Sequence, residues 1–192
     1  MIMTDTDRRD VVEVLTHDHR EVQEMFGKFE TAGIGDARNV KALVDEVVIE
    51  LSRHSVAEEE HLYPAVRRCV PNGNAMADRE IREHADAEVL MRDLSRMEPN
   101  DEEFGPKLAR LMATVREHIA EEEEQLFPAL VAHSTQSELD ELGRKVIAAK
   151  KAAPTRPHPS VPHSPPMDKV LAPALGLVDK VRDALTHRGT KD

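Results

Sequence analysis

One segment of this sequence occurs twice, and this repeat restricts the folds that the chain can adopt. Residues 54–66 read HSVAEEEHLYPAV and residues 118–130 read HIAEEEEQLFPAL, with seven of thirteen positions identical. The preceding segments also correspond, since DHREV around His19 matches EHADAEV around His84 at nearly the same offset. A chain built from two copies of one unit is expected to pack them together, so that paired residues meet at a central axis.

Each copy contains two long segments with helical periodicity. Apolar side chains recur every three, four or seven residues over about 8–30, 36–68, 75–97 and from about 100 onward. Asn100, with Glu103 three residues later, predicts the N-terminal cap of the fourth segment. Short turn-forming stretches separate the segments, which makes neighbouring helices antiparallel. We therefore predict an all-α, up-down-up-down four-helix bundle formed by a duplicated helical hairpin.

A short fifth helix and a C-terminal extension are expected after the bundle. Thr135 and Glu138 match a capping box, and the apolar face that follows consists of Leu139, Leu142 and Val146. Residues 152–166 contain six prolines, which predicts an extended linker. An amphipathic pattern over residues 167–188 predicts a last helix that docks on the bundle or on another protein. The bundle domain itself is predicted to span residues 8–151.

Charge and cysteine content exclude several classes of protein. The chain has 26 Lys and Arg against 37 Asp and Glu, a net charge of −11, which argues against nucleic-acid binding. Cys69 is the single cysteine, so one chain can form neither a disulfide nor a thiolate cluster. The sequence has no apolar run of membrane-spanning length and no secretory signal at its N-terminus, so we expect a cytoplasmic location without membrane contact.

Six histidine and glutamate side chains interrupt the apolar stripes of the four helices. They are His19, His54, Glu58, His84, His118 and Glu122. Because residues four apart share a helix face, His54 and Glu58 point the same way, as do His118 and Glu122. A single histidine on an apolar face is more often a hydrogen-bonded core residue than a ligand. Six polar residues at matched positions of two repeats favour a metal site, since a metal compensates the cost of burying carboxylates.

The types of ligand suggest the metal. Imidazole and carboxylate groups without thiolate suit iron or manganese, and zinc less so. If Glu58 and Glu122 each bridge two ions, each ion receives two imidazoles and one oxygen from each carboxylate. An oxo or hydroxo bridge would raise this to five ligands and leave a vacancy for dioxygen, peroxide or nitric oxide. We expect two iron ions, with manganese or zinc as alternatives.

The repeated motif HxxxEExxL followed by Tyr-Pro or Phe-Pro is similar to that of the hemerythrin-like, or HHE cation-binding, domain. The motif lies at His54–Pro64 and His118–Pro128, with a lone histidine in each preceding helix, and the resemblance covers about residues 8–150. It implies a four-helix bundle with a non-haem di-iron centre held by the six residues above. Oxygen-carrying hemerythrins have a second histidine where this chain has Glu88, and a final HxxxxD motif that it lacks, which disfavours reversible oxygen carriage.

Three further residues are secondary candidates for the site. Glu88 is either an extra ligand or proton acceptor near the metal, or a plain carboxylate on the helix face. His61 lies seven residues after His54 and is expected at the rim, since its counterpart in the repeat is a glutamine. Tyr63 matches Phe127 and is expected to pack in the core, with a hydroxyl that could reach the site. The remaining glutamates of the two acidic runs are expected to be solvated.

These features predict a non-haem di-iron protein that binds or reacts with a small oxidant: dioxygen, peroxide or nitric oxide. Its role would lie in the response to oxidative or nitrosative stress, and its enzymatic form would be catalase-like or peroxidase-like. One alternative is a redox or gas sensor that signals to a protein partner through the C-terminal helix. The other is iron storage or donation, for which the iron should be labile.

Overall fold

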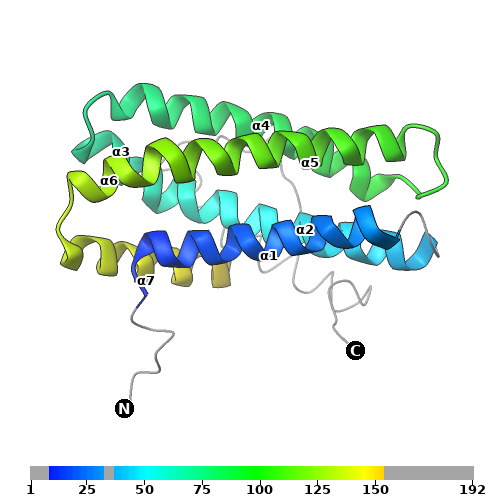
Figure 1. The fold of residues 1–192 in the computed structure, drawn as a ribbon, viewed down its shortest axis with the longest axis horizontal. Helices are drawn as coiled ribbons and strands as arrows, with labels where there is room; N and C mark the ends of the chain where they lie inside the picture. Colours follow the sequence, from blue (N-terminus) through cyan, green and yellow to red (C-terminus); the bar gives the residue numbers. More distant parts are fainter. Residues whose placement is uncertain (1–8, 33–36, 154–192) are drawn as a thin grey trace, which may run out of the picture.

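The computed structural model describes residues 9–32 and 37–153, and every regular element in this part of the chain is helical. The four long helices are α1 (Val11–Ala32), α2 (Ala37–Ala57), α4 (Gly73–Arg96) and α5 (Phe104–Glu121). Two π-helical turns, η2 (Glu58–Leu62) and η3 (Glu122–Leu126), connect α2 to α3 (Tyr63–Cys69) and α5 to α6 (Phe127–Ala132). A last helix, α7, spans Gln136–Ala152. The predicted all-α bundle of two helical hairpins is confirmed (Figure 1).

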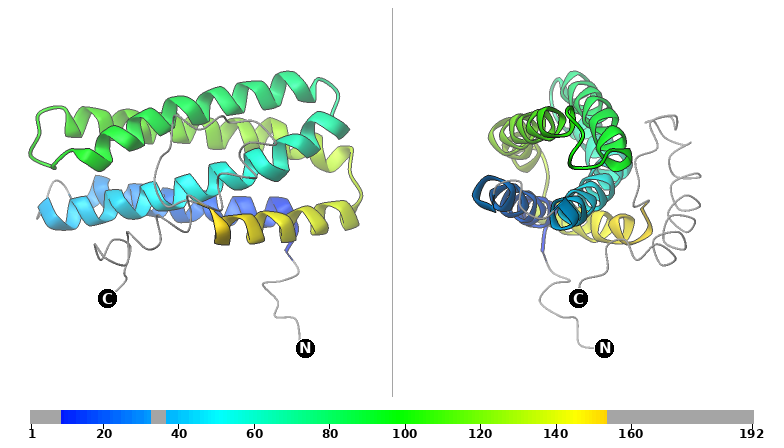
Figure 2. Two further views of the ribbon diagram at one scale, coloured as in Figure 1. Left: turned by 180° about the vertical axis from the view of Figure 1, so that it is seen from behind. Right: turned by 90° about the vertical axis from the view of Figure 1, so that its right-hand side faces the viewer.

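The four long helices surround a common axis, and α7 lies outside the bundle. Helix α1 packs against α2 and α5, and α4 packs against α2 and α5. The end-on view in Figure 2 shows this arrangement, with α7 (yellow) lying below the bundle. Helix α7 contacts α1, α2 and η2. The fifth helix is therefore added to the side of the bundle that the first hairpin forms.

Both π-helical turns precede a proline. The sequence predicted one uninterrupted helix over 36–68, but Tyr63 donates its backbone N–H to the carbonyl of Glu58, five residues earlier. Phe127 makes the equivalent hydrogen bond to Glu122. Proline has no N–H and its ring clashes with the carbonyl four residues earlier, so it is tolerated in the first turn of a new helical segment. The π turns place Pro64 and Pro128 in that position.

Apolar side chains form two clusters, one toward each end of the bundle. One cluster contains Val22 and Phe26, and the other contains Leu15 and residues of α3, α6 and α7. His19 follows Leu15 by one helical turn and precedes Val22 by another, so it lies between the two clusters. The polar residues on the other three helices occupy the same level. The site therefore separates two apolar cores that hold its four helices in place.

One predicted cap is wrong and another is confirmed. Asn100 lies in an exposed turn, and α5 begins at Phe104 without a side-chain cap. The Asp101 side chain organises this turn instead, because its carboxylate accepts the backbone N–H of Glu98 at 2.8 Å. At the start of α7, Thr135 and Glu138 form both hydrogen bonds of the predicted capping box.

Helix α7 approaches the start of α1 closely. A Cβ atom at Gly143 would lie 2.6 Å from the carbonyl oxygen of Arg9, so only glycine fits here without a shift of the backbone. Leu139 and Val146, predicted on the apolar face of α7, are buried. The predicted C-terminal helix 167–188 and the linker 152–166, apart from its first two residues, lie outside the described residues. Among the described helices, none is long and apolar enough to cross a membrane.

Candidate metal centre

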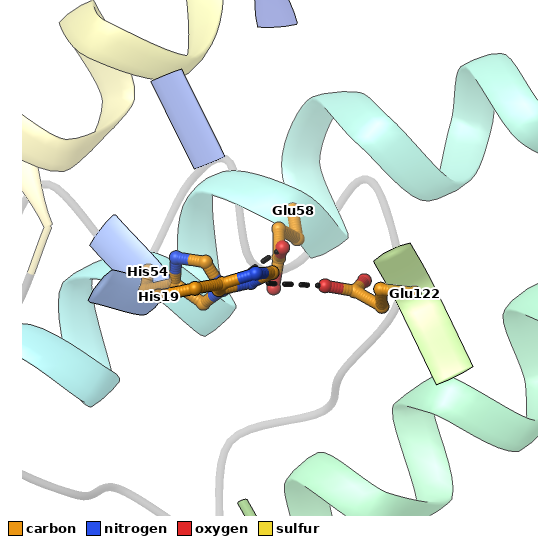
Figure 3. Close-up of side chains that lie close together, drawn as sticks. All are labelled: His19, His54, Glu58 and Glu122. Atoms are coloured by element: carbon orange, nitrogen blue, oxygen red, sulfur yellow. Dashed lines mark ion pairs between the residues drawn. The ribbon is translucent and has the colours of Figure 1, made fainter. Parts of the chain in front are cut away.

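The structure brings the six predicted ligands together at the centre of the bundle. His19 comes from α1, His54 from α2, His84 from α4 and His118 from α5. Glu58 and Glu122 are the first residues of the two π turns. All six side chains are buried, and both glutamates are completely inaccessible to solvent. Figure 3 shows His19, His54, Glu58 and Glu122 pointing toward one another from separate elements. We call His19 and His54 the first half of the cluster, and His84 and His118 the second half.

Each glutamate lies between histidines of both halves. Glu58 Oε1 is 3.0 Å from His54 Nε2, and Glu58 Oε2 is 3.4 Å from His84 Nε2. Glu122 Oε2 is 3.4 Å from His19 Nε2 and 3.7 Å from His118 Nε2. The carboxylates are therefore placed as bridging ligands would be, with one imidazole of each half beside each of them.

The inward-facing atoms fit a metal because they have few other partners. His19 Nε2, both oxygens of Glu58 and Glu122 Oε2 are buried and make no hydrogen bond. A buried carboxylate without such bonds costs several kcal/mol, unless a cation compensates it. Ligand atoms of His19, His54, Glu58 and Glu122 lie within 4.8 Å of one another, as do those of Glu58, His84 and His118. These two overlapping groups share Glu58, which is consistent with room for two ions.

The outer nitrogen of each histidine faces a carboxylate. His19 Nδ1 lies 2.8 Å from Glu123, His54 Nδ1 lies 3.4 Å from Asp18, and His84 Nδ1 lies 2.9 Å from Glu59. His118 Nδ1 lies 3.1 Å from Glu83 and 3.0 Å from Glu80. Such carboxylates orient an imidazole and favour the tautomer with a proton on Nδ1, which leaves Nε2 free to bind a metal. All four Nε2 atoms then point inward.

These outer carboxylates were not among the site residues predicted from the sequence. Glu59 and Glu123 were expected to be solvated, but Glu59 is buried and both contact histidines. Their signal was the repeat itself, since each directly follows a predicted bridging glutamate. Asp18 and Glu83 likewise each precede a predicted histidine ligand by one residue. Equivalent acidic residues in both copies of the unit would have indicated a shared role.

Burial and charge together set the protonation of the cluster. Burial raises the pKa of Glu58, but the imidazoles of His54 and His84 beside it outweigh this and hold that pKa well below its usual value. Burial lowers the pKa of His54, but Glu58 and Asp18 raise it overall to about 10. Burial also lowers the pKa of His118, but Glu122, Glu80 and Glu83 outweigh it and raise that pKa well above its usual value. Without metal, protons therefore balance the buried carboxylates.

The secondary candidates are placed differently from one another. Tyr63 is fully buried, and its hydroxyl donates to Glu122 Oε1 at 3.2 Å and lies 3.1 Å from His84 Nε2. His61 is part-exposed, lies 3.7 Å from Glu60 and belongs to neither group of converging ligand atoms described above. Glu88 is half-buried on α4 and belongs to neither group of converging ligand atoms.

A small apolar cavity adjoins the four histidines. Its volume is about 30 Å³, room for one or two water-sized molecules. Besides the histidines, its walls include Val22, Leu51, Ala87, Met91, Val115 and Ile119, but neither Glu58 nor Glu122. The four histidines therefore border the cavity, whereas Glu58, Glu122 and Tyr63 do not.

The fold and this cluster define a metal-binding four-helix bundle, and the comparisons with known proteins identify its family. Residues 10–130 match the model of the hemerythrin HHE cation-binding domain. A hemerythrin-like protein of Schizosaccharomyces pombe is 30% identical over 176 residues, which cover 91% of this chain and 86% of that protein. The chain belongs to the hemerythrin HHE cation-binding domain family. Its buried histidine–glutamate cluster is therefore suited to a metal cofactor such as iron.

Two further matches have different coverage. The crystal structure of a hemerythrin HHE cation-binding domain-containing protein from Mycobacterium kansasii superposes with a TM-score of 0.64 at 25% identity. The match covers 74% of this chain and 86% of that one. A DNA nickase of Nostoc is 24% identical over 147 residues, 76% of this chain but only 41% of that protein. The match therefore spans less than half of the nickase chain.

Proposed function

We propose that this protein holds two iron ions and uses them to bind or reduce a small oxidant. The ligands would be His19 and His54 for one ion, His84 and His118 for the other, with Glu58 and Glu122 bridging. The observation that carries the proposal is the position of each glutamate between imidazoles of both halves. A bound iron pair would supply one-electron redox steps and a coordination position for the oxidant.

The surrounding residues limit the class of oxidant. The cavity of about 30 Å³ on the histidine side admits molecules of two to four atoms, and its apolar walls favour nitric oxide or dioxygen over ions. Hydrogen peroxide is small enough to enter as well. Tyr63 would hold Glu122 in place by its hydrogen bond and would offer a proton beside Glu122 and His84. In the enzymatic form, two molecules of hydrogen peroxide would yield two of water and one of dioxygen.

The outer carboxylates favour the oxidised state of such a centre. Asp18, Glu59, Glu80, Glu83 and Glu123 contact the imidazoles from outside, so negative charge surrounds the cluster. Negative charge near a metal stabilises its more positive oxidation state. A site that rests oxidised suits the removal of oxidants better than reversible carriage of dioxygen, which needs a stable reduced state.

Metal analysis of protein purified without chelators tests the proposal directly. We expect about two irons per chain and absorption bands from an oxo-bridged ferric pair. Hydrogen peroxide should then be consumed with release of half as much dioxygen, and nitric oxide should change the spectrum of the reduced protein. A chain that remains free of iron after reconstitution would refute the proposal, and rapid loss of iron to a chelator would favour storage or donation.

A further inference from the structure

The first half of the cluster has a partly buried cation in its outer surroundings. Lys150 of α7 places its Nζ 2.6 Å from Asp18 Oδ1, and Asp18 Oδ2 lies 3.4 Å from His54 Nδ1. Only 17% of the Lys150 side chain is exposed, so solvent screens its charge weakly. The ammonium group therefore opposes the negative charge that Asp18 directs toward His54.

The second half has an additional buried anion at the equivalent level. Glu80 lies one helical turn before His84 and is completely buried, with its Oε2 3.0 Å from His118 Nδ1. The corresponding residue of the first repeat is Leu15, which carries no charge. Glu83 also contacts His118, while Arg79 pairs with Glu80 at 3.3 Å and is 37% exposed. More negative charge therefore remains around His118 than around His54.

The carboxylates on the other two histidines reinforce this difference. Glu59, beside His84, is buried, whereas Glu123, beside His19, is 39% exposed. An exposed charge is screened by water and salt, so Glu123 acts on its half more weakly than Glu59 does on the other. The inner ligands of the two halves are the same, but the potential outside them is not.

We infer that the His19–His54 half accepts an electron before the His84–His118 half, and that Lys150 and Glu80 set this order. The inference rests on the proposed iron pair. Adding one electron to the oxidised centre converts one ferric ion to ferrous, and positive charge near an ion favours that change. Lys150 favours reduction of the first half, and Glu80 disfavours reduction of the second. Both residues therefore stabilise the half-reduced protein.

The quantity to measure is the equilibrium constant for the reaction of one fully oxidised and one fully reduced chain to give two half-reduced chains. One electron passes between the chains, so the reaction is balanced. We would titrate iron-loaded protein with a one-electron reductant and quantify the half-reduced state by its electron paramagnetic resonance signal. The variants are Lys150→Met and Glu80→Gln, with Lys150→Arg to keep the charge. Lys145→Met is the matched control, since Lys145 lies on the same helix in an exposed pair with Glu141.

Opposite charge changes are expected to have the same effect. Lys150→Met and Glu80→Gln remove charges of opposite sign, yet each should lower the constant about threefold, because the constant depends on the difference in potential that one weakly screened charge at about 10 Å creates between two ions a few ångströms apart. Lys150→Arg and Lys145→Met should leave it unchanged within the error of the titration. Constants that stay unchanged, or that move in opposite directions in Lys150→Met and Glu80→Gln, would overturn the inference. If only Glu80→Gln changed the constant, the role assigned to Lys150 would be refuted.

Iron content and unfolding curves of each variant separate this inference from the proposed function. Wild-type protein without two irons would refute the proposed function before any redox titration. Wild-type protein with two irons but equal constants in all variants would refute only the order of reduction. If Lys150→Met fails to fold or to bind iron, Lys150→Gln is measured in its place. Glu80→Gln still tests the effect of charge on the second half.

Discussion

The two halves of the cluster have the same inner ligands in different surroundings. Each half offers two histidines on antiparallel helices and shares both glutamates. Outside these ligands, Leu15 of the first repeat corresponds to Glu80 of the second, and Phe127 corresponds to Tyr63. Helix α7 packs beside the first hairpin. Duplication therefore accounts for the ligands, and divergence around them accounts for what makes the halves unequal.

Tyr63 and Phe127 occupy equivalent positions of the two repeats, and the hydroxyl oxygen of the tyrosine gives its position an additional role. The Phe127 ring stacks on His19 with centroids 5.7 Å apart, and so fixes that imidazole by packing. The Tyr63 ring lies 5.4 Å from His84, and its hydroxyl additionally donates to Glu122. The tyrosine of the first repeat thus acts on the second half of the cluster. Each repeat therefore depends on the other to position its ligands.

The largest expected effect is the loss of iron from both halves of the cluster at once. Glu58→Ala or Glu122→Ala should reduce bound iron from about two per chain to nearly none, because each carboxylate faces both halves. His54→Ala should lose about one ion. Metal analysis after reconstitution measures this, and Glu124→Ala, in the same acidic run but exposed, is the control. A Glu58→Ala protein with two irons would show that Glu58 does not bridge.

The second prediction concerns the pH dependence of the metal-free chain. The folded pKa of His54 is raised to about 10, so its protonation stabilises the fold fully below about pH 6.5 and is lost as the pH rises toward 10. The free energy of unfolding should fall by several kcal/mol over that range. Urea unfolding at a series of pH values measures it.

The iron-loaded chain supplies the contrast for that measurement. Metal replaces the protons on the inward nitrogens, so this loss of stability between pH 7 and 10 should be absent. Below about pH 4.5, the lowered pKa of Glu58 predicts that metal-free protein loses stability as the pH falls. Equal slopes with and without iron between pH 7 and 10 would contradict the proton balance inferred for the cluster.

The six inner residues were predictable from the sequence because two independent signals indicate them: spacing along the helix and repetition of the motif. His54 and Glu58 share a face in any α-helix, and the second copy of the motif confirms that spacing at His118 and Glu122. Helix packing then brings both pairs to one level of the bundle. The structure shows this convergence, while the assignment of the six residues as ligands stays a prediction.

The outer residues were predictable from the sequence only in part, because the repeat pairs Glu59 with Glu123 and Asp18 with Glu83 but helical spacing does not predict their contacts. Glu59 follows Glu58 in an acidic run, where helical periodicity places it off the inward stripe, and the π turn changes this geometry. Glu80 belongs to no repeated motif, since its counterpart is Leu15. Lys150 lies 132 residues from Asp18 in sequence, and only the packing of α7 brings them together. Such contacts depend on tertiary structure rather than on local spacing.

The third prediction concerns a substitution that makes the two halves of the cluster more alike. Tyr63→Phe gives the first repeat the residue of the second and removes the hydrogen bond to Glu122 Oε1. A buried carboxylate oxygen that loses its donor costs about 1–3 kcal/mol, measured as a lower free energy of unfolding of the metal-free protein. Iron content should remain near two, and the absorption bands should shift. An unchanged spectrum and stability would show that the hydroxyl does not act on Glu122.

The smallest expected effect tests whether α7 acts on the first half alone. Thr135→Ala removes the capping box and should destabilise α7 by about 1 kcal/mol, with Ser137→Ala, exposed in the same first turn, as the control. Hydrogen exchange should then become faster in α7, while α4 and α5 keep their protection. Because Lys150 would leave Asp18 more often, the environment of His54 should change and that of His118 should not. Equal changes at both histidines would show that the bundle responds as one unit.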